Sequence, residues 1–381
     1  MTQRVVFADH AAGSPLKPAV AEAMMAALTG LPPNPSGAHR MARATANVLD
    51  GAREEVASLL GVSPREIVFV GGGTEACNLA LRAGGSISGM VVSPIEHSAI
   101  SMAAQREAQR RGVGLGSMNV GTEGVVDVDA TAARIPDGAL VALMAANNET
   151  GAIQPVAQLR AKLIELGHTV TLISDAIGAA AVMDLTEVIS VADIVTIAGH
   201  KLGGPPGVAV MVVKEGTPLD PLVIGGGQEL SRRGGTQDVA GIVGFATALR
   251  LSHEDLTSGR VAHLGQQRDA LQAAIVGELG DGVVVSATHV PRLASHLHLR
   301  FPGVRSDELL MLLDQHGLCA SAGSACSSGA STISHVLEAM EVSMAEAKGA
   351  LRLSLSTSTV DDDVEWMANT VIEAVRQLRN A

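Results

Sequence analysis

The sequence predicts an α/β protein with a mostly parallel sheet, and three observations support this prediction. From about residue 60 to residue 215, short apolar runs alternate with longer helical patterns, which is typical of successive βαβ units. The apolar runs are continuous, as expected for strands buried on both faces of a sheet. The 381 residues are 47% hydrophobic but only 1% aromatic, so Ala, Val, Leu, Ile and Met must fill a closely packed core.

The predicted elements of this region follow in order along the chain. The first is a long helix over His39–Leu60, which is entered from the proline-rich turn Leu31–Ser36. Helices over His97–Arg111 and Val156–Leu166 have the length of crossover connections between parallel strands. The predicted strands are Ile67–Val70, Met90–Ser93, Leu140–Met144, Val170–Ser174, Ile194–Ile197 and Val208–Val213.

The pattern changes in the last third of the chain. A largely helical stretch over Val239–Leu279 is predicted to bridge two domains, with a boundary near Asp255. Shorter mixed elements follow, including predicted strands over Ser295–Phe301 and Leu351–Leu355. The acidic run Asp361–Asp363 indicates the start of the final helix, because carboxylates stabilise a helix N-terminus.

Charge and composition make several classes of protein poor candidates. The chain has 27 Lys and Arg against 39 Asp and Glu, a net charge of -12, and few aromatic rings on which bases could stack. We therefore expect no direct binding of nucleic acid. No run approaches the ~18 continuous apolar residues of a membrane helix, so we expect no membrane span. Asp9 and His10 lie where an export signal needs its apolar segment, so no such signal is expected.

The three cysteines, Cys77, Cys319 and Cys326, form neither a CxxC pair nor a Cys/His cluster at metal-binding spacing. An odd number of cysteines in a chain of this size does not indicate a disulfide framework. We therefore expect no metal site, and a reducing cytoplasm fits the chain best.

Three motifs follow predicted strands, at the edge where open α/β sheets bind their ligands. Gly71–Glu75 lies between a strand and a helix, and is either a phosphate cradle or a tight turn. Asp175 ends a strand, where a carboxylate faces a cationic ring nitrogen or caps the next helix. Lys201 lies in the rigid Gly199–Gly207 loop, whose context favours a desolvated Schiff-base amine over a solvated surface charge. Together these are the parts that pyridoxal 5′-phosphate (PLP) needs.

The chain also resembles a known family, the cysteine desulfurases, within aminotransferase class V of the fold type I PLP enzymes. The resemblance extends over essentially the whole length, in eleven ordered segments: ADHAAGSPL (8–16), NPSGAH (34–39), GGGTEACNLAL (71–81), EHSAI (96–100), NNETG (147–151), SDAIGA (174–179), GHKLGGPPG (199–207), GGGQELSRRGGTQDVAGIVGF (225–245), SAGSACSSG (321–329), SHVL (334–337) and RLSLS (352–356).

The resemblance implies a two-domain fold. A large PLP-binding domain over residues 15–255 would hold a mostly parallel seven-stranded sheet flanked by helices. A smaller α+β domain over residues 1–14 and 256–381 would carry the catalytic cysteine loop, at about residues 320–333.

Site residues carry over from the resemblance position by position. They are Lys201 as the Schiff-base lysine, His97 stacked on the cofactor ring and assisting proton transfer, Gly73, Thr74 and His200 at the phosphate, Asp175 at the ring nitrogen, Asn148 at the cofactor and substrate, and Asn34 and Arg352 at the substrate. Thr236 would reach the phosphate of the neighbouring subunit, which implies a homodimer.

Cys326 is the candidate nucleophile, because it lies among small residues in Gly323–Gly329. The alternative is a small buried hydrophobic residue. We interpret Cys319 as a core residue, and Cys77 either as core or as a thiol whose pKa is lowered at a helix N-terminus. The resemblance implies that L-cysteine becomes L-alanine, and that the sulfur leaves as a persulfide on Cys326 for an acceptor protein.

The chain departs from the family pattern at a few positions. Many members have Gln at Gly178, Ser at Ala198 and a polar or acidic residue at Cys77. We expect the first two changes to weaken cofactor binding by roughly 1–3 kcal/mol. The spacing after Cys326 resembles the long-loop subgroup of nitrogenase and general iron–sulfur cluster assembly. A selenocysteine lyase or another class V PLP enzyme remains an alternative, as does a non-catalytic partner protein that keeps the fold.

Overall fold

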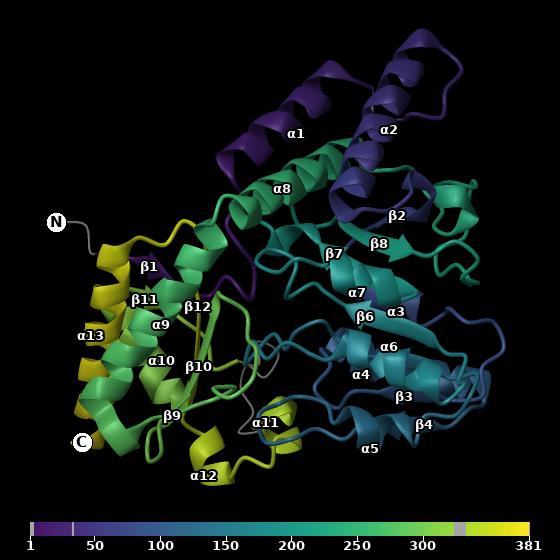
Figure 1. Cartoon of the computed structure of the whole chain (residues 1–381). Coiled ribbons are helices and arrows are strands. Elements are labelled where there is room, and N and C mark those ends of the chain that lie inside the picture. Colours follow the sequence, from purple (N-terminus) through teal and green to yellow (C-terminus); the bar gives the residue numbers. More distant parts are fainter. Residues whose placement is uncertain (1–3, 33, 324–332, 381) are drawn as a thin grey trace.

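The computed structural model describes residues 4–32, 34–323 and 333–380. Its largest element is a seven-stranded sheet in the order β2-β8-β7-β6-β5-β3-β4, on the right in Figure 1. Only β8 runs antiparallel to its neighbours in this sheet. The bounds of the seven strands are β2 Ile67–Val70, β3 Met90–Val92, β4 Leu115–Ser117, β5 Leu140–Ala142, β6 Thr171–Asp175, β7 Ile194–Ala198 and β8 Ala209–Val213.

The six strands predicted for this sheet are confirmed, with ends that differ by at most two residues. The seventh, β4, is missing from the prediction. It is an edge strand whose three residues are all exposed, so it has no apolar run to mark it. The inner strands can be predicted because burial on both faces gives them continuous apolar runs.

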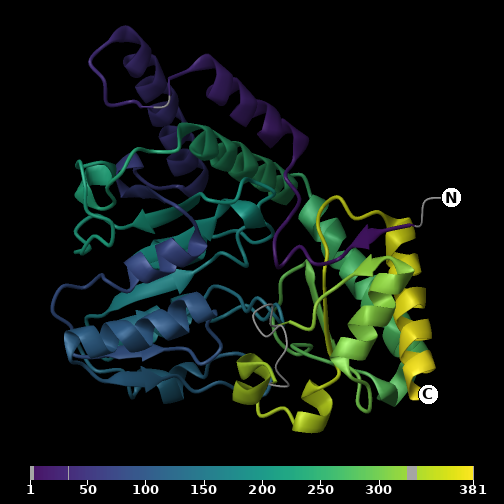
Figure 2. The same cartoon turned by 180° about the vertical axis from the view of Figure 1, so that it is seen from behind.

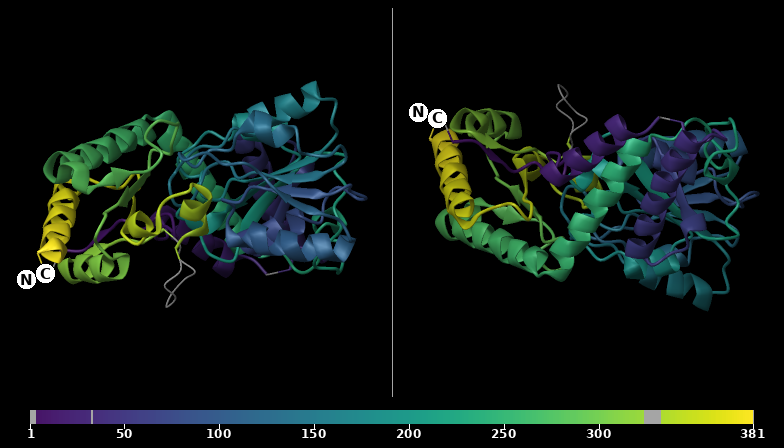
Figure 3. Two further views of the ribbon diagram at one scale, coloured as in Figure 1. Left: turned by 90° about the horizontal axis from the view of Figure 1, so that it is seen from below. Right: turned by 90° about the horizontal axis from the view of Figure 1, so that it is seen from above.

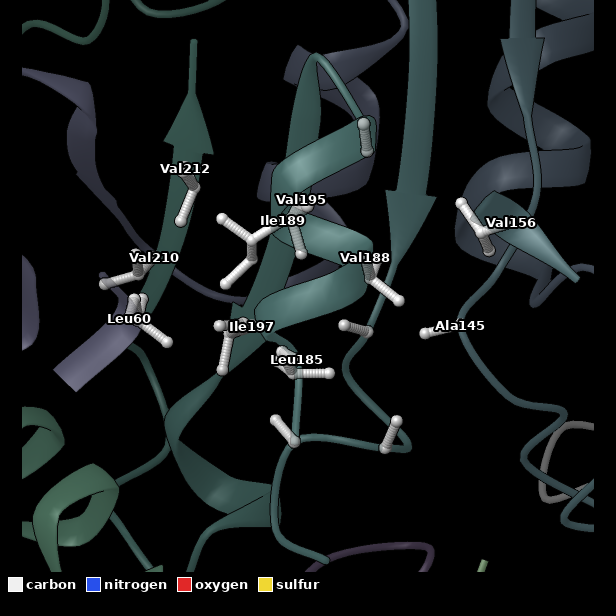
Figure 4. Packing of buried hydrophobic residues seen from close by; sticks show 14 of the residues in the cluster. Leu60, Ala145, Val156, Leu185, Val188, Ile189, Val195, Ile197, Val210 and Val212 are labelled. Atoms are coloured by element: carbon white, nitrogen blue, oxygen red, sulfur yellow. The ribbon is translucent and has the colours of Figure 1, made fainter. Parts of the chain in front are cut away.

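Helices cover both faces of the sheet, as the view from below in Figure 3 shows. Successive residues of β2 point to opposite sides: Val68 joins a cluster with α3 and α4, whereas Phe69 joins a cluster with α2, α6, α7 and α8. Figure 4 shows part of the second cluster, with Val188 and Ile189 lying over Val195 of β7. The bounds of these helices are α2 Arg40–Leu60, α3 Gly73–Ala80, α4 Ser98–Arg111, α6 Val156–Glu165, α7 Thr186–Val191 and α8 Val239–Thr257.

The stretch over Val239–Leu279 is largely helical, as predicted. The stretch consists of two helices, α8 and α9 (Arg260–Leu279), separated at Ser258 and Gly259. Gly259 has φ +83°, a left-handed conformation that glycine adopts without strain. The chain therefore turns at this point.

The second part of the molecule has its own sheet and core. Its sheet has the order β12-β10-β9, and β1 pairs with β11 beside it. Both ends of the described chain lie here (Figures 1 and 2). Its hydrophobic cluster joins Val6 and Ala8 to residues between Leu264 and Val375. Such separate packing supports the predicted division near Asp255, which stays a prediction.

The remaining elements complete this part and its connections. Strands predicted over Ser295–Phe301 and Leu351–Leu355 correspond to β10 and β12, and the acidic run opens α13 as predicted. Within the described ranges, no helix combines the length and apolarity needed to cross a membrane. The bounds of these elements are β1 Val6–Phe7, α1 Pro18–Gly30, α5 Val128–Ala132, β9 Val284–Val285, β10 His296–Arg300, α10 Ser306–His316, β11 Leu318–Cys319, α11 His335–Ala339, α12 Met344–Ala347, β12 Ala350–Ser354 and α13 Asp361–Arg379.

Candidate active site

A cavity lies where the parallel strands of the large sheet end. Seven of the residues predicted for the site line it together: Gly73, Thr74, His97, Asn148, Asp175, His200 and Lys201. These residues lie at or just after the ends of five strands, β2, β3, β5, β6 and β7. The sheet thus brings together residues that are more than 120 positions apart in the sequence. Gly178, where many family members have Gln, lines the cavity as well. Three further lining residues are missing from the prediction: Ala99, Met144 and Ile177. Their apolar side chains give no chemical signal in the sequence.

The N-terminus of α3 has the properties of an anion site. Its N-cap residue is Gly72, which provides no side-chain hydrogen bond, so the first backbone N–H groups of the helix have no cap. A Cβ at Gly73 would lie 2.7 Å from Cδ1 of Ile177, so a larger residue there would displace the Ile177 side chain that lines the cavity. Glu75 accepts a hydrogen bond from Gly71 N (2.8 Å) and is paired with Arg233 (2.8 Å), which offsets its charge near the helix end.

Asp175 is a buried carboxylate at the end of β6. Its Oδ1 accepts hydrogen bonds from Ile177 N (2.9 Å) and the Thr196 hydroxyl (3.3 Å). Burial raises the pKa of Asp175, and these donors oppose the rise. The alternative of a helix cap is wrong, because the next helix, α7, begins only at Thr186.

Lys201 has the desolvated amine that its loop predicts. Burial lowers the pKa of Lys201 to about 8, and the positive charge of Arg352 adds to this effect. Its Nζ donates to the carbonyl oxygen of Ala11 and to that of Ala12 (2.8 Å for the latter). The alternative of a solvated surface lysine is therefore wrong.

The two imidazoles of the cavity are held neutral. Burial lowers the pKa of His97, and burial lowers that of His200 to about 4. His97 is the N-cap of α4, and its Nδ1 accepts from Ala99 N at 3.1 Å. The neutral ring of His97 therefore carries its proton on Nε2.

Arg352 lies at the boundary of the two parts of the molecule and is 2% exposed. Its Nη1 donates to the carbonyl oxygens of Asn148 (2.9 Å) and Gly323 (3.0 Å), and its Nη2 to Asp9 Oδ1 (2.6 Å). Its buried Nε has no hydrogen-bond partner among the described residues. The Nε side of the guanidinium thus keeps donor capacity for a carboxylate.

The residues present fit PLP. The uncapped α3 N-terminus suits a phosphate, the buried carboxylate of Asp175 suits a cationic ring nitrogen, and the low-pKa amine of Lys201 suits an aldehyde. His97 and Ile177 line the same cavity, where a flat ring has to lie.

Comparison with known proteins agrees with this geometry. The aminotransferase class V family matches residues 6–367. The chain belongs to aminotransferase class V. Similar proteins include an IscS-like cysteine desulfurase from Mycobacterium tuberculosis, 37% identical over 388 residues that cover 99% of this chain and 98% of the relative.

Two further proteins are similar to this class V chain over nearly its whole length, one in sequence and one in structure. A cysteine desulfurase from Nostoc sp. is 33% identical over 382 residues, which cover 98% of this chain and 94% of that protein. A solved structure described as a NifS-like protein has a TM-score of 0.89 at 29% identity, covering 98% of this chain and all of that one. The predicted family and fold are confirmed.

Four predicted site residues are not among the residues that line the cavity: Asn34, Thr236, Cys326 and Arg352, whose contacts are given above. Asn34 and Thr236 are exposed on the loops before α2 and α8. Asn34 Oδ1 accepts from Ser36 N at 2.9 Å. Cys326 lies outside the described residues.

Of the other two cysteines, Cys77 fits one of its two predicted interpretations and Cys319 differs from its prediction. Cys77 is fully buried in the second turn of α3, and burial together with Asp175 raises the pKa of its thiol, so the predicted lowering is wrong. Its alternative, a core residue, is confirmed. Cys319 is only half-buried on β11, where its neighbour Leu318 enters the core instead.

Proposed function

We propose that the protein is a PLP-dependent cysteine desulfurase. It converts L-cysteine to L-alanine and passes the sulfur, as a persulfide on Cys326, to an acceptor protein. The observation that carries this proposal is the meeting of Lys201, Asp175 and the uncapped α3 N-terminus in one cavity. The names of the relatives support the choice of substrate.

Each group of the cavity has a part in holding PLP. The backbone of Gly73, the hydroxyl of Thr74 and the ring of His200 would hold the phosphate. Asp175 would accept from the ring nitrogen, and Lys201 would bind the aldehyde carbon. When bound, PLP withdraws electrons from the bonds at Cα and Cβ of the substrate.

Lys201 also moves the proton at Cα. An amine with a pKa of about 8 is partly neutral near neutral pH, so it can accept a proton and return it. The carbonyl oxygens of Ala11 and Ala12 hold Nζ in place when it is free.

Arg352 would bind the substrate carboxylate through the side of its guanidinium that has no protein partner. Asn148 joins this contact, because its backbone already fixes Arg352 and its side chain lines the cavity. Asn34 is a further substrate-binding candidate, by resemblance only.

Sulfur transfer is the role that we assign to Cys326. Its thiolate attacks the sulfur of the substrate, an S–S bond forms, and the electrons of the breaking Cβ–S bond stay with carbon, which ends as alanine after protonation. Support comes from Gly323, whose carbonyl oxygen binds Arg352 and which precedes Cys326 by three residues. The start of the SAGSACSSG segment therefore lies at the proposed carboxylate site.

The functional unit is proposed to be a homodimer, in which Thr236 serves the site of the neighbouring subunit. Thr236 is exposed on the same loop as Ile224 (86% exposed) and Leu230 (59% exposed). Glu229, Leu230 and Ser231 all have positive φ, and the buried Glu229 carboxylate fixes this strained turn by accepting from Phe69 N at 3.0 Å. A rigid loop that presents apolar side chains suits a subunit interface.

The acceptor is proposed to be a protein, as in iron–sulfur cluster assembly, and the compartment to be the cytoplasm. The net charge of -12 argues against direct contact with nucleic acid.

The function is tested with purified protein, PLP, L-cysteine and a reductant. We expect sulfide and alanine in equal amounts, loss of both in Cys326→Ser, and loss of the bound cofactor's visible absorbance in Lys201→Ala. Unchanged sulfide release by Cys326→Ser would exclude the role of Cys326. Activity with selenocysteine alone would favour a selenocysteine lyase, and protein that stays colourless with PLP would favour a non-catalytic partner.

A further inference from the structure

Cys77 has no part in the proposed chemistry, yet it lies against the carboxylate of Asp175. Its Sγ donates to Asp175 Oδ2 at 3.6 Å and lies 3.9 Å from the Thr196 hydroxyl. The other oxygen, Oδ1, is bound by Ile177 N and by Thr196. Within the described part of the chain, Cys77 provides the one hydrogen bond found at Oδ2.

The thiol stays protonated in this environment. Cys77 is fully buried, and both burial and the charge of Asp175 raise the pKa of its thiol. It is therefore an S–H donor to Asp175 and not a competing anion. Because burial raises the pKa of Asp175 itself, each donor that it receives favours its ionised form.

A second buried acid, Glu96, lies near Asp175. Glu96 is 1% exposed, accepts from Met144 N through Oε1 at 2.6 Å, and has no partner on Oε2 among the described residues. Burial and Asp175 raise the pKa of Glu96. Of the two acids, Asp175 is the one that receives three hydrogen bonds, and these favour its ionised form.

We propose that Cys77 is a positioning residue, whose thiol acts with the Thr196 hydroxyl to orient the Asp175 carboxylate toward the ring nitrogen of bound PLP. Cys77 approaches from α3, Thr196 from β7 and the Ile177 amide from the turn after β6, so three elements fix the two oxygens. The inference rests on the proposed function, since it requires PLP in the cavity.

The choice of sulfur has a physical consequence. A thiol is a weak donor, so it orients the carboxylate while leaving most of its basicity for the ring nitrogen. A serine hydroxyl is a stronger donor at similar geometry, whereas alanine provides none. An aspartate at this position would place a second carboxylate beside Asp175, and like charges there raise the pKa of the pair.

The test measures PLP binding to the full-length protein after the cofactor has been removed. For Cys77→Ala we expect the dissociation constant for PLP to rise about 2- to 10-fold, the range for one lost hydrogen bond. Cys77→Ser should restore it to within about twofold of the wild type. Thr196→Val should weaken binding like Cys77→Ala, and Thr196→Ser should not. Cys319→Ala, at a half-buried cysteine on another sheet, is the matched control and should bind normally.

The pH dependence of PLP binding shows whether Cys77 positions the Asp175 carboxylate or only fills space in the core. The groups that face Asp175 are Cys77, Glu96, His97 and Lys201. Loss of the thiol donor raises the pKa of Asp175 further, so PLP affinity in Cys77→Ala should begin to fall at a higher pH on acidification. Cys77→Ser should move this onset back toward the wild type.

Each outcome has a clear meaning. Wild-type affinity and pH onset in Cys77→Ala would overturn the inference, and so would a Cys77→Ser variant as weak as Cys77→Ala, because packing alone would then explain the effect. Wild-type protein that does not bind PLP would overturn the proposed function instead. Thermal melting of the cofactor-free variants identifies any that fail to fold. If a Cys77 variant fails to fold, the comparison of Thr196→Val with Thr196→Ser tests the inference instead.

Discussion

Asp9 affects two side chains of the candidate site, Arg352 and Lys201. It accepts from Nη2 of Arg352 at 2.6 Å, and it raises the pKa of Lys201, opposing the effects of burial and Arg352. Asp9 therefore fixes the guanidinium that would bind substrate and balances the positive charge around the amine. Only its position in the ADHAAGSPL segment connects it with the site in the sequence.

We predict that Asp9→Asn raises KM for L-cysteine about 10-fold, in line with the loss of a charged hydrogen bond, with a smaller change in kcat. The amide still accepts one bond but no longer carries the charge that holds Arg352. Steady-state kinetics of sulfide release would measure this. Asp307→Asn, at an exposed carboxylate paired with Arg305, is the control and should behave as wild type. An unchanged KM in Asp9→Asn would show that Arg352 is held in place without Asp9.

At the residue scale, the polar residues that line the cavity were largely predictable and their apolar neighbours were not. Lys201, Asp175 and His97 stand out because charged or polar residues follow apolar strands. Ile177 has no such signal, because an isoleucine near a strand end is equally consistent with core. The contact of Cys77 with Asp175 joins residues 98 positions apart, and no local pattern encodes it.

Among the elements, strands with two buried faces were predictable and short peripheral ones were not. β7 is buried at all five positions and appears as a continuous apolar run. β1, β9 and β11 have two residues each, too few for a periodicity. The position of the break between α8 and α9 was not predicted within the largely helical stretch, because Gly259 interrupts the helical pattern for a single turn.

Gly259 and Gly277 make a matched pair for testing the α8–α9 break. A Cβ at either position would meet nothing within 4 Å, but only Gly259 has positive φ. We predict that Gly259→Ala lowers the free energy of unfolding by about 1 kcal/mol through left-handed strain, whereas Gly277→Ala, inside α9, raises it by about 0.5–1 kcal/mol. Urea denaturation of both variants measures the difference. Equal stability of the two would contradict the strain assigned to Gly259.

On the scale of the whole molecule, the two cores meet at the site. Arg352 and Ser354 lie on β12 of the smaller part, Lys201 follows β7 of the larger one, and the N-terminal segment contacts both. Ala11 N donates to Ser354 Oγ at 2.9 Å, and the Ala11 carbonyl oxygen accepts from Lys201 Nζ. The proposed roles of Arg352 in substrate binding and of Lys201 in proton transfer are thus connected through the backbone of residues 9–11. This junction depends on contacts between distant segments, which explains why the sequence predicts two domains more readily than how they meet.

The proposed dimer gives the last prediction. Ile224→Asp places a carboxylate on the most exposed large apolar side chain of the loop that carries Thr236, and burying an unpaired charge in an interface is unfavourable. We predict a shift from dimer to monomer in light scattering, together with weaker PLP binding, because Thr236 would no longer reach the neighbouring subunit. Met311→Asp, at a side chain 66% exposed on α10 of the smaller part, is the control and should stay dimeric. A monomeric Ile224→Asp variant that binds PLP as tightly as wild type would show that each chain completes its cofactor site alone, whereas a dimeric variant would place the subunit interface elsewhere.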